Sequence, residues 1–113
     1  MLLPDPINVW LCGTPTDMRK AANGLSQLVV DNLAANPQSG DLFVFYNRQR
    51  DRLKILYWHF NGFCLLQKRL EKNRFKVNFD FENKLSISER QLYRLLEGLH
   101  FINESEEKYD IFY

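Results

Sequence analysis

The chain lacks most of the features that mark a secreted, membrane or disulfide-stabilised protein. It has two cysteines among 113 residues, Cys12 and Cys64, with no C-x-x-C pair or Cys/His cluster beside them, so we expect two free thiols rather than a disulfide or a zinc site. No apolar run approaches the roughly 20 residues that span a bilayer. The opening segment, MLLPDPINVW, lacks the basic flank and long apolar stretch of a signal peptide. We therefore expect a cytoplasmic protein with no membrane partner.

Catalytic and metal-binding patterns are also missing. The two histidines, His59 and His100, have no serine or cysteine at a recognisable catalytic spacing. The acidic residues are scattered, and their spacing predicts no metal site. No phosphate-binding G-x-x-x-x-G-K-[ST] loop occurs. The sequence predicts no enzyme activity, no metal and no cofactor.

The composition is that of a folded chain with a modest core. Apolar residues make up 45% of the sequence and aromatic residues 14%, which is richer than a disordered chain. The length suits a single domain over residues 1–113. We expect residues 1–6 and 103–113 to be loosely attached termini.

The hydrophobic pattern predicts an α+β fold: an antiparallel sheet of about four strands, one helix packed across it and a C-terminal helix. Short β-branched and aromatic runs predict strands at residues 7–12, 41–46, 52–60 and 63–70. The first helix is expected to begin at Thr14, followed by Pro15, because apolar residues then recur at helical spacing to Leu33. Ser86 or Ser88 is expected to cap the last helix.

A hairpin signal sets the expected register of the sheet. Asn61-Gly62 is a strong two-residue turn, which places Trp58 opposite Leu65. One face, containing Leu42 and Val44, is then nearly all apolar and should pack on the first helix. The other face mixes rings with cations, and it predicts an aromatic surface made of Phe43, Phe45 and Trp58.

Charge is unevenly distributed although the formal net charge is only +1. Residues 47–76 carry nine basic and two acidic residues, whereas residues 80–113 carry eight acidic and four basic ones. The nine basic residues are Arg48, Arg50, Arg52, Lys54, Lys68, Arg69, Lys72, Arg74 and Lys76. Cations held together on a scaffold bind phosphates, and neighbouring rings can stack on bases. The block therefore predicts a nucleic-acid surface; a solvated strand edge or a site for an acidic protein are the alternatives.

A second candidate anion site lies in TPTDMRKAANGL. If a helix begins there, Arg19 and Lys20 fall in its first turn, where the helix dipole disfavours cations. An anion docked at the helix start, held by Thr16, Arg19 and Lys20, would account for them. Local pairing of Arg19 with Asp17 is the alternative.

These motifs together resemble a known family. The stretches PTDMRK, SGDLFVFYNRQRDRLKILYW, GFCLLQKRLEKNRF and LSISERQLYRLLEG are similar to the small accessory protein TnpB of insertion-sequence-sixty-six-type bacterial transposable elements. The resemblance covers residues 7–102. It implies a role in transposition beside a separate transposase, and it offers no catalytic residue to carry over.

Residue chemistry and resemblance together predict a non-catalytic accessory factor in DNA transposition. Its expected partners are DNA at the element ends, contacted through the basic hairpin surface, and the transposase of the same element. The alternative is a protein adaptor that binds the transposase without touching DNA.

Overall fold

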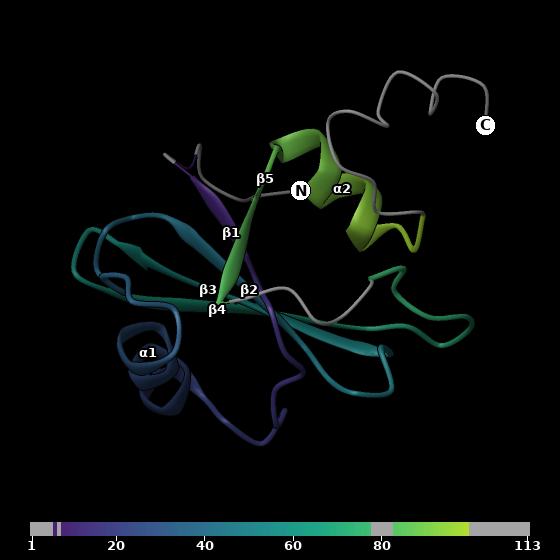
Figure 1. The fold of residues 1–113 in the computed structure, drawn as a ribbon, viewed down its shortest axis with the longest axis horizontal. Coiled ribbons are helices and arrows are strands. Elements are labelled where there is room, and N and C mark those ends of the chain that lie inside the picture. The colour runs from purple at the N-terminus through teal and green to yellow at the C-terminus, as the bar shows by residue number, and fades with distance from the viewer. Residues whose placement is uncertain (1–5, 7, 78–82, 100–113) are drawn as a thin grey trace.

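In the part of the chain that the structure describes, the sheet has five strands in the order β4-β3-β2-β1-β5 (Figure 1). This computed structural model describes residues 6, 8–77 and 83–99. Along the chain the elements are β1 (Val9–Cys12), α1 (Ala22–Asp31), β2 (Leu42–Tyr46), β3 (Arg52–His59), β4 (Gly62–Arg69), β5 (Lys84–Ile87) and α2 (Glu89–Leu96). The α+β class is confirmed, and the strands predicted at residues 41–46, 52–60 and 63–70 lie within one residue of β2, β3 and β4.

The expectation of an antiparallel sheet of about four strands is partly wrong. β1 runs parallel to β2, because α1 lies in the connection between them and returns the chain to the same end of the sheet. The pairs β1–β5, β2–β3 and β3–β4 are antiparallel. The sheet is therefore mixed, and β5 is a strand that the sequence pattern did not predict.

Both faces of the sheet are covered, each by its own hydrophobic cluster. On one face α1 places Leu25 and Val29 against Phe43, Phe45 and Leu56. On the other face lie α2 and residues 75–77, over a cluster that includes Val44, Leu53, Ile55, Phe75 and Leu95. Figure 1 shows the two helices on opposite sides of the strands.

Two predictions about these faces are wrong. The face with Leu42 and Val44 packs on α2 instead of the first helix. Phe43 and Phe45 form no surface, because α1 buries both side chains completely. Removing apolar rings from water is favourable, and the helix that connects the parallel strands packs over these two rings.

The β3–β4 hairpin turns one residue earlier than predicted. His59 pairs with Gly62 and Trp58 with Phe63, so the loop is Phe60-Asn61 rather than Asn61-Gly62. Each residue of β3 therefore meets a partner two positions from the expected one. A shift of two keeps every side chain on its predicted face.

The first helix begins at Ala22, well after the predicted start at Thr14. Residues 14–20 are irregular because their backbone groups bond to the sheet: the Thr16 N–H donates to the Tyr46 carbonyl at 2.8 Å. Arg19 and Lys20 thus precede the helix and are not in its first turn. For the second helix, the prediction is confirmed at Ser88, whose side chain and that of Gln91 form a reciprocal capping box.

The expected loose segments, residues 1–6 and 103–113, lie outside the described residues except for Pro6. Among the described helices, none is both long enough and apolar enough to cross a membrane.

Candidate anion-binding cleft

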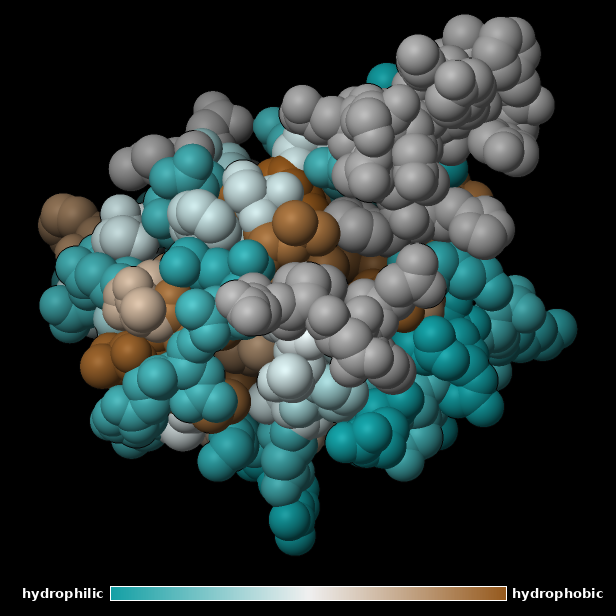
Figure 2. Space-filling model, in the orientation of Figure 1, coloured by the Kyte–Doolittle hydropathy of each residue, from teal (hydrophilic) through white to brown (hydrophobic). Residues whose placement is uncertain are grey.

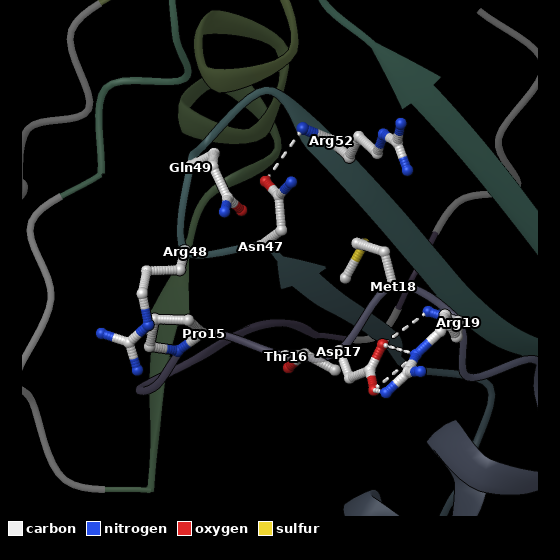
Figure 3. Close-up of a pocket in the computed structure, with 9 residues that line it drawn as sticks. All are labelled: Pro15, Thr16, Asp17, Met18, Arg19, Asn47, Arg48, Gln49 and Arg52. Carbon is white, nitrogen blue, oxygen red and sulfur yellow. Dashed lines mark hydrogen bonds and ion pairs between the residues drawn. The ribbon is translucent and has the colours of Figure 1, made fainter.

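The two motifs that sequence reasoning treated separately meet at one end of the molecule. A cleft of about 470 Å³ lies between residues 15–19 and the turn that joins β2 to β3. Its lining residues are Pro15, Thr16, Asp17, Met18, Arg19, Asn47, Arg48, Gln49 and Arg52 (Figure 3). Three arginines therefore line one hollow, although Arg19 is far in the sequence from Arg48 and Arg52.

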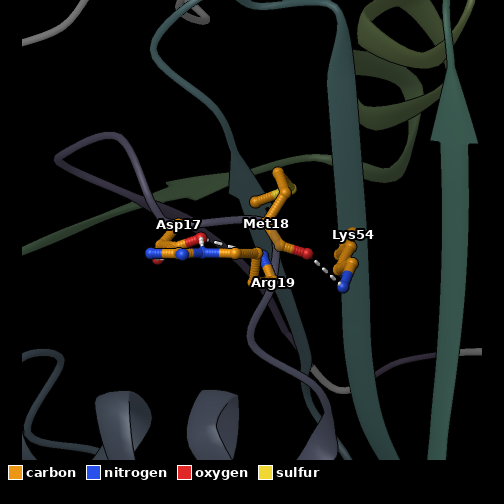
Figure 4. A network of polar contacts seen from close by, with 4 residues as sticks. All are labelled: Asp17, Met18, Arg19 and Lys54. Carbon is orange, nitrogen blue, oxygen red and sulfur yellow. Dashed lines mark hydrogen bonds and ion pairs between the residues drawn. The ribbon is translucent and has the colours of Figure 1, made fainter.

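Lys54 holds one wall of this cleft in place. Its side chain is only 6% exposed, and its ammonium donates to the Met18 carbonyl oxygen at 2.7 Å (Figure 4). It also donates to the Lys20 carbonyl oxygen at 2.7 Å. These two bonds fasten the segment before α1 across β3. Lys54 is thus a structural residue, and its assignment to an exposed nucleic-acid surface is wrong.

Asn47 orders the opposite wall. Its side-chain oxygen accepts from the backbone N–H groups of Asp51 and Arg52, both at 3.0 Å. Its side-chain amide donates to the Asp51 carboxylate at 2.6 Å. This hydrogen bond, followed by a backbone hydrogen bond and the charges of Arg52 and Arg74, lowers the pKa of Asp51 below its usual range. The turn that displays Arg48 and Arg52 is therefore built from local polar contacts.

The local pairing of Arg19 with Asp17 is confirmed. The Arg19 guanidinium donates to both carboxylate oxygens, with the shortest contact 2.7 Å. Hydrogen bonds from the Arg19 side chain and backbone lower the pKa of Asp17 from 3.8 to about 2. Asp17 thus neutralises part of one wall. Of the other two predicted anion ligands, Thr16 is buried and Lys20 is exposed just outside the lining.

Arg52 faces a second arginine on the neighbouring strand. Arg52 of β3 and Arg69 of β4 are directly paired across the hairpin, and both are exposed. Like charges placed opposite each other destabilise a strand pair. The pair lies beside the cleft that Arg52 and Arg48 line, so positive charge is concentrated at this end of the sheet.

Several of the nine predicted cations are directed elsewhere. Lys68 lies on the face covered by α2, where its ammonium donates to the Leu96 carbonyl at 2.6 Å. Arg50 is half-buried and donates to the Val77 carbonyl at 3.2 Å. Arg74 donates to the Gln49 carbonyl but remains exposed. The prediction of one common surface is therefore wrong for Lys54, Lys68 and Arg50.

The remaining predicted cations are exposed. They are Arg48, Arg52, Arg69, Lys72, Arg74 and Lys76. In Figure 2 hydrophilic side chains gather over the end of the molecule where the β2–β3 turn and the segment after β4 lie in Figure 1. Trp58, the third residue of the predicted aromatic surface, is half-buried. Its ring packs edge-on against Phe63, with ring centroids 5.0 Å apart.

Sequence reasoning missed Asn47 and Gln49 as parts of the cleft. The signal for Asn47 was present, since asparagine at the start of a polar turn commonly bonds the backbone two residues on. Gln49 had no comparable signal. No group of three or more histidine, cysteine or carboxylate side chains suited to a metal ion occurs in the part of the chain that the structure describes.

Comparison with known proteins identifies the family. The family model described as "IS66 Orf2 like protein" matches residues 7–106. The chain belongs to this family. Membership implies an accessory role in the transposition of IS66-type insertion elements, in agreement with the resemblance read from the sequence motifs.

Two similar proteins come from Sinorhizobium fredii, and both are named as uncharacterized. The protein y4hO is 35% identical over 100 residues, which cover 88% of this chain and 87% of y4hO. The protein y4jC is 34% identical over 93 residues, which cover 82% of this chain and 80% of y4jC. No solved structure matches the chain.

Proposed function

We propose that the protein serves transposition by binding the phosphate backbone of DNA with the arginines of the cleft and the exposed cations beside it. The observation that carries this proposal is the direct pairing of Arg52 with Arg69, next to Arg48 on the cleft wall. The pairing places two positive charges opposite each other on neighbouring strands, and an anion bound beside them would relieve their repulsion.

A phosphate is the anion that suits these groups. Guanidinium is planar and presents a fork of N–H donors that matches two phosphate oxygens, so arginine binds phosphates with defined geometry. Arg48 and Arg52 stand on an ordered turn rather than a loose one, because Asn47 fixes it. A preorganised turn loses less conformational entropy when the ligand binds.

The ligand is a polyanion rather than a single small ion. Exposed Lys72, Arg74 and Lys76 continue the positive surface beyond the cleft along the segment after β4. One phosphate could not engage such a spread of charge, whereas a DNA backbone offers successive phosphates. Contacts of this kind position DNA without reading its sequence.

A titration of fluorescent duplex DNA at two salt concentrations tests the proposal. We expect affinity to fall steeply as salt rises, because neutralised phosphates release counterions. The triple variant Arg48→Ala, Arg52→Ala, Arg69→Ala should reduce the slope of log affinity against log salt by about three. Binding that is unchanged in the triple variant would reject the cleft as the DNA site.

A matched control separates local contact from overall charge. Arg48→Glu and Arg90→Glu each change the net charge by the same amount, but Arg90 is exposed on α2, away from the cleft lining. We expect Arg48→Glu to weaken DNA binding far more than Arg90→Glu. Equal weakening would mean that the arginines act only through net charge.

A protein adaptor without DNA contact is the second candidate function. The observation that favours it is a hollow on α2 lined by Glu89, Arg90, Tyr93, Arg94, Glu97 and Leu99, whose mixed charges and apolar groups suit a protein surface. In that case the chain would co-purify with the transposase after nuclease treatment and would not retain DNA even at low salt.

A further inference from the structure

The outer edge of β4 carries little of the usual protection against pairing with another strand, since its exposed charged residue, Arg69, is the last one of the strand. In the sheet order β4 is at one end, so its outer side faces no other described strand. It has eight residues, no proline and an uninterrupted register with β3. Edges are usually kept apart by short length, prolines, bulges or exposed lysines. The lysine of this strand, Lys68, is turned back to the Leu96 carbonyl.

The backbone groups available on this edge follow from the hairpin register. A two-residue loop closes on a hydrogen-bonded pair, here His59 with Gly62. Hydrogen-bonded and non-hydrogen-bonded pairs then alternate along the ladder. Consequently Phe63, Leu65, Gln67 and Arg69 direct their N–H and C=O groups outward, where a further strand would meet them.

Exposed apolar side chains lie on the same hairpin. Only four large hydrophobic residues are exposed in the described part of the chain, and two of them, Phe60 and Leu65, belong to the β3–β4 hairpin. Leu65 is 37% exposed at the middle of the strand, and Phe60 is 88% exposed at the tip. Phe60 also has a φ of +59°, a conformation that a bulky side chain rarely adopts.

We propose that β4 pairs antiparallel with β4 of a second copy of this chain, about a two-fold axis at Leu65. Directly opposed residues must share a face, so the sum of their numbers is even. Within β4, a sum of 130 pairs residues 62–68 of one copy with 68–62 of the other, and a sum of 132 pairs residues 63–69 with 69–63, so the two ladders are equally long. The first sum is chosen because it places the exposed Leu65 of each copy on the axis, whereas the second places Leu65 opposite Gln67. Pairing about Leu65 joins the two five-stranded sheets into one of ten strands.

The side chains fit this register. Leu65 meets Leu65, so the two exposed leucines cover each other. Lys68 lies opposite Gly62 and Arg69 opposite Asn61, so no two cations face each other across the axis. Beyond the paired residues Phe60 extends towards Leu70 of the second copy, which would cover the exposed ring. A two-fold contact needs such self-complementarity, because each surface must fit its own copy.

Oligomeric state measured without DNA tests the proposal independently of the cleft. Sedimentation equilibrium of the full chain should show a dimer. Leu65→Lys places two ammonium groups face to face on the axis, and should weaken the dimer at least roughly tenfold. Val30→Lys is the matched control, because Val30 is an exposed apolar residue, 51% exposed, that lies on α1 and not on β4. It should leave the dimer intact.

Cross-linking checks the register and does not depend on how Leu65→Lys folds. In a Cys64→Ser background, Leu65→Cys should form an intermolecular disulfide on mild oxidation, since paired residues on the axis lie within disulfide range. Gln67→Cys should not, because Gln67 faces Phe63 of the second copy. A wild-type chain that stays monomeric, a dimer indifferent to Leu65→Lys, or equal cross-linking of both cysteine variants would each overturn the proposal.

Discussion

The two ends of the β3–β4 hairpin expose side chains of opposite character. At the end next to the β2–β3 turn, Arg52 faces Arg69 in solvent. At the tip, Trp58 packs on Phe63 and the Phe60 ring stands in solvent. One end carries two exposed positive charges, and the other exposes an apolar ring to solvent. One regular hairpin thus exposes positive charge at one end and an apolar ring at the other, and each end belongs to one of the two binding surfaces proposed above.

The largest expected effect concerns Lys54, which fastens residues 18–20 over the arginine end of the hairpin. Lys54→Met leaves the carbonyl oxygens of Met18 and Lys20 without their charged donor. We expect the free energy of unfolding to fall by about 3 kcal/mol, measured by urea denaturation. Lys20→Met is the control, since the Lys20 side chain is exposed, and it should change stability by less than about 0.5 kcal/mol. Equal losses in both variants would contradict the structural role of Lys54.

A smaller effect of the opposite sign is expected at the tip. Phe60→Gly removes the strain of a left-handed backbone at φ +59°, and should raise the free energy of unfolding of the monomer by about 1 kcal/mol. Asn61→Gly should give no such gain, because Asn61 is not among the residues with positive φ. Thermal melts at low protein concentration compare the two. A loss of stability in Phe60→Gly would show that the ring contributes more to the monomer than its exposure suggests.

The smallest effect concerns the arginine pair. Arg69→Ala removes one of two like charges and should stabilise the protein by about 0.5 kcal/mol at low salt, while weakening DNA binding. The gain should vanish at high salt, where exposed charges are screened. Melting temperatures at low and high salt measure it, with Arg90→Ala as the control. A destabilised Arg69→Ala would mean that the Arg52–Arg69 pair is not repulsive, and would remove the main support for an anion at this site.

Local pattern was enough to predict the central strands and the cap of α2, because alternation and the serine signal act over a few residues. It failed where distant groups compete for the backbone. Thr14, Pro15 and Asp17 have the residue types of a helix start, but Tyr46 and Lys54 bind the backbone that follows. β5 was missed because its four residues, KLSI, offer only two apolar positions.

The sequence predicted which residue types form the candidate site, but not which individual residues belong to it. Composition identified the arginines of the β2–β3 turn, and the structure places Arg48 and Arg52 on the cleft. Composition could not separate these arginines from Lys54 and Lys68, because a lysine that binds a carbonyl oxygen and a lysine in solvent count as the same formal charge. Which face a helix covers decides between them, and that depends on contacts far apart in the sequence.

If two copies join through β4 as proposed, the unequal lengths of the two sheet edges limit how far the assembly can grow. Joining two copies through β4 consumes the long border of each, and leaves β5, with four residues, at both ends of the joined sheet. Lys84 of that short strand is bound to the Leu33 carbonyl at 2.7 Å and lies 4.9 Å from the Trp10 ring, so it is fastened to its own molecule. A sheet that grows from one border only stops at two copies, which favours a discrete particle over a fibre.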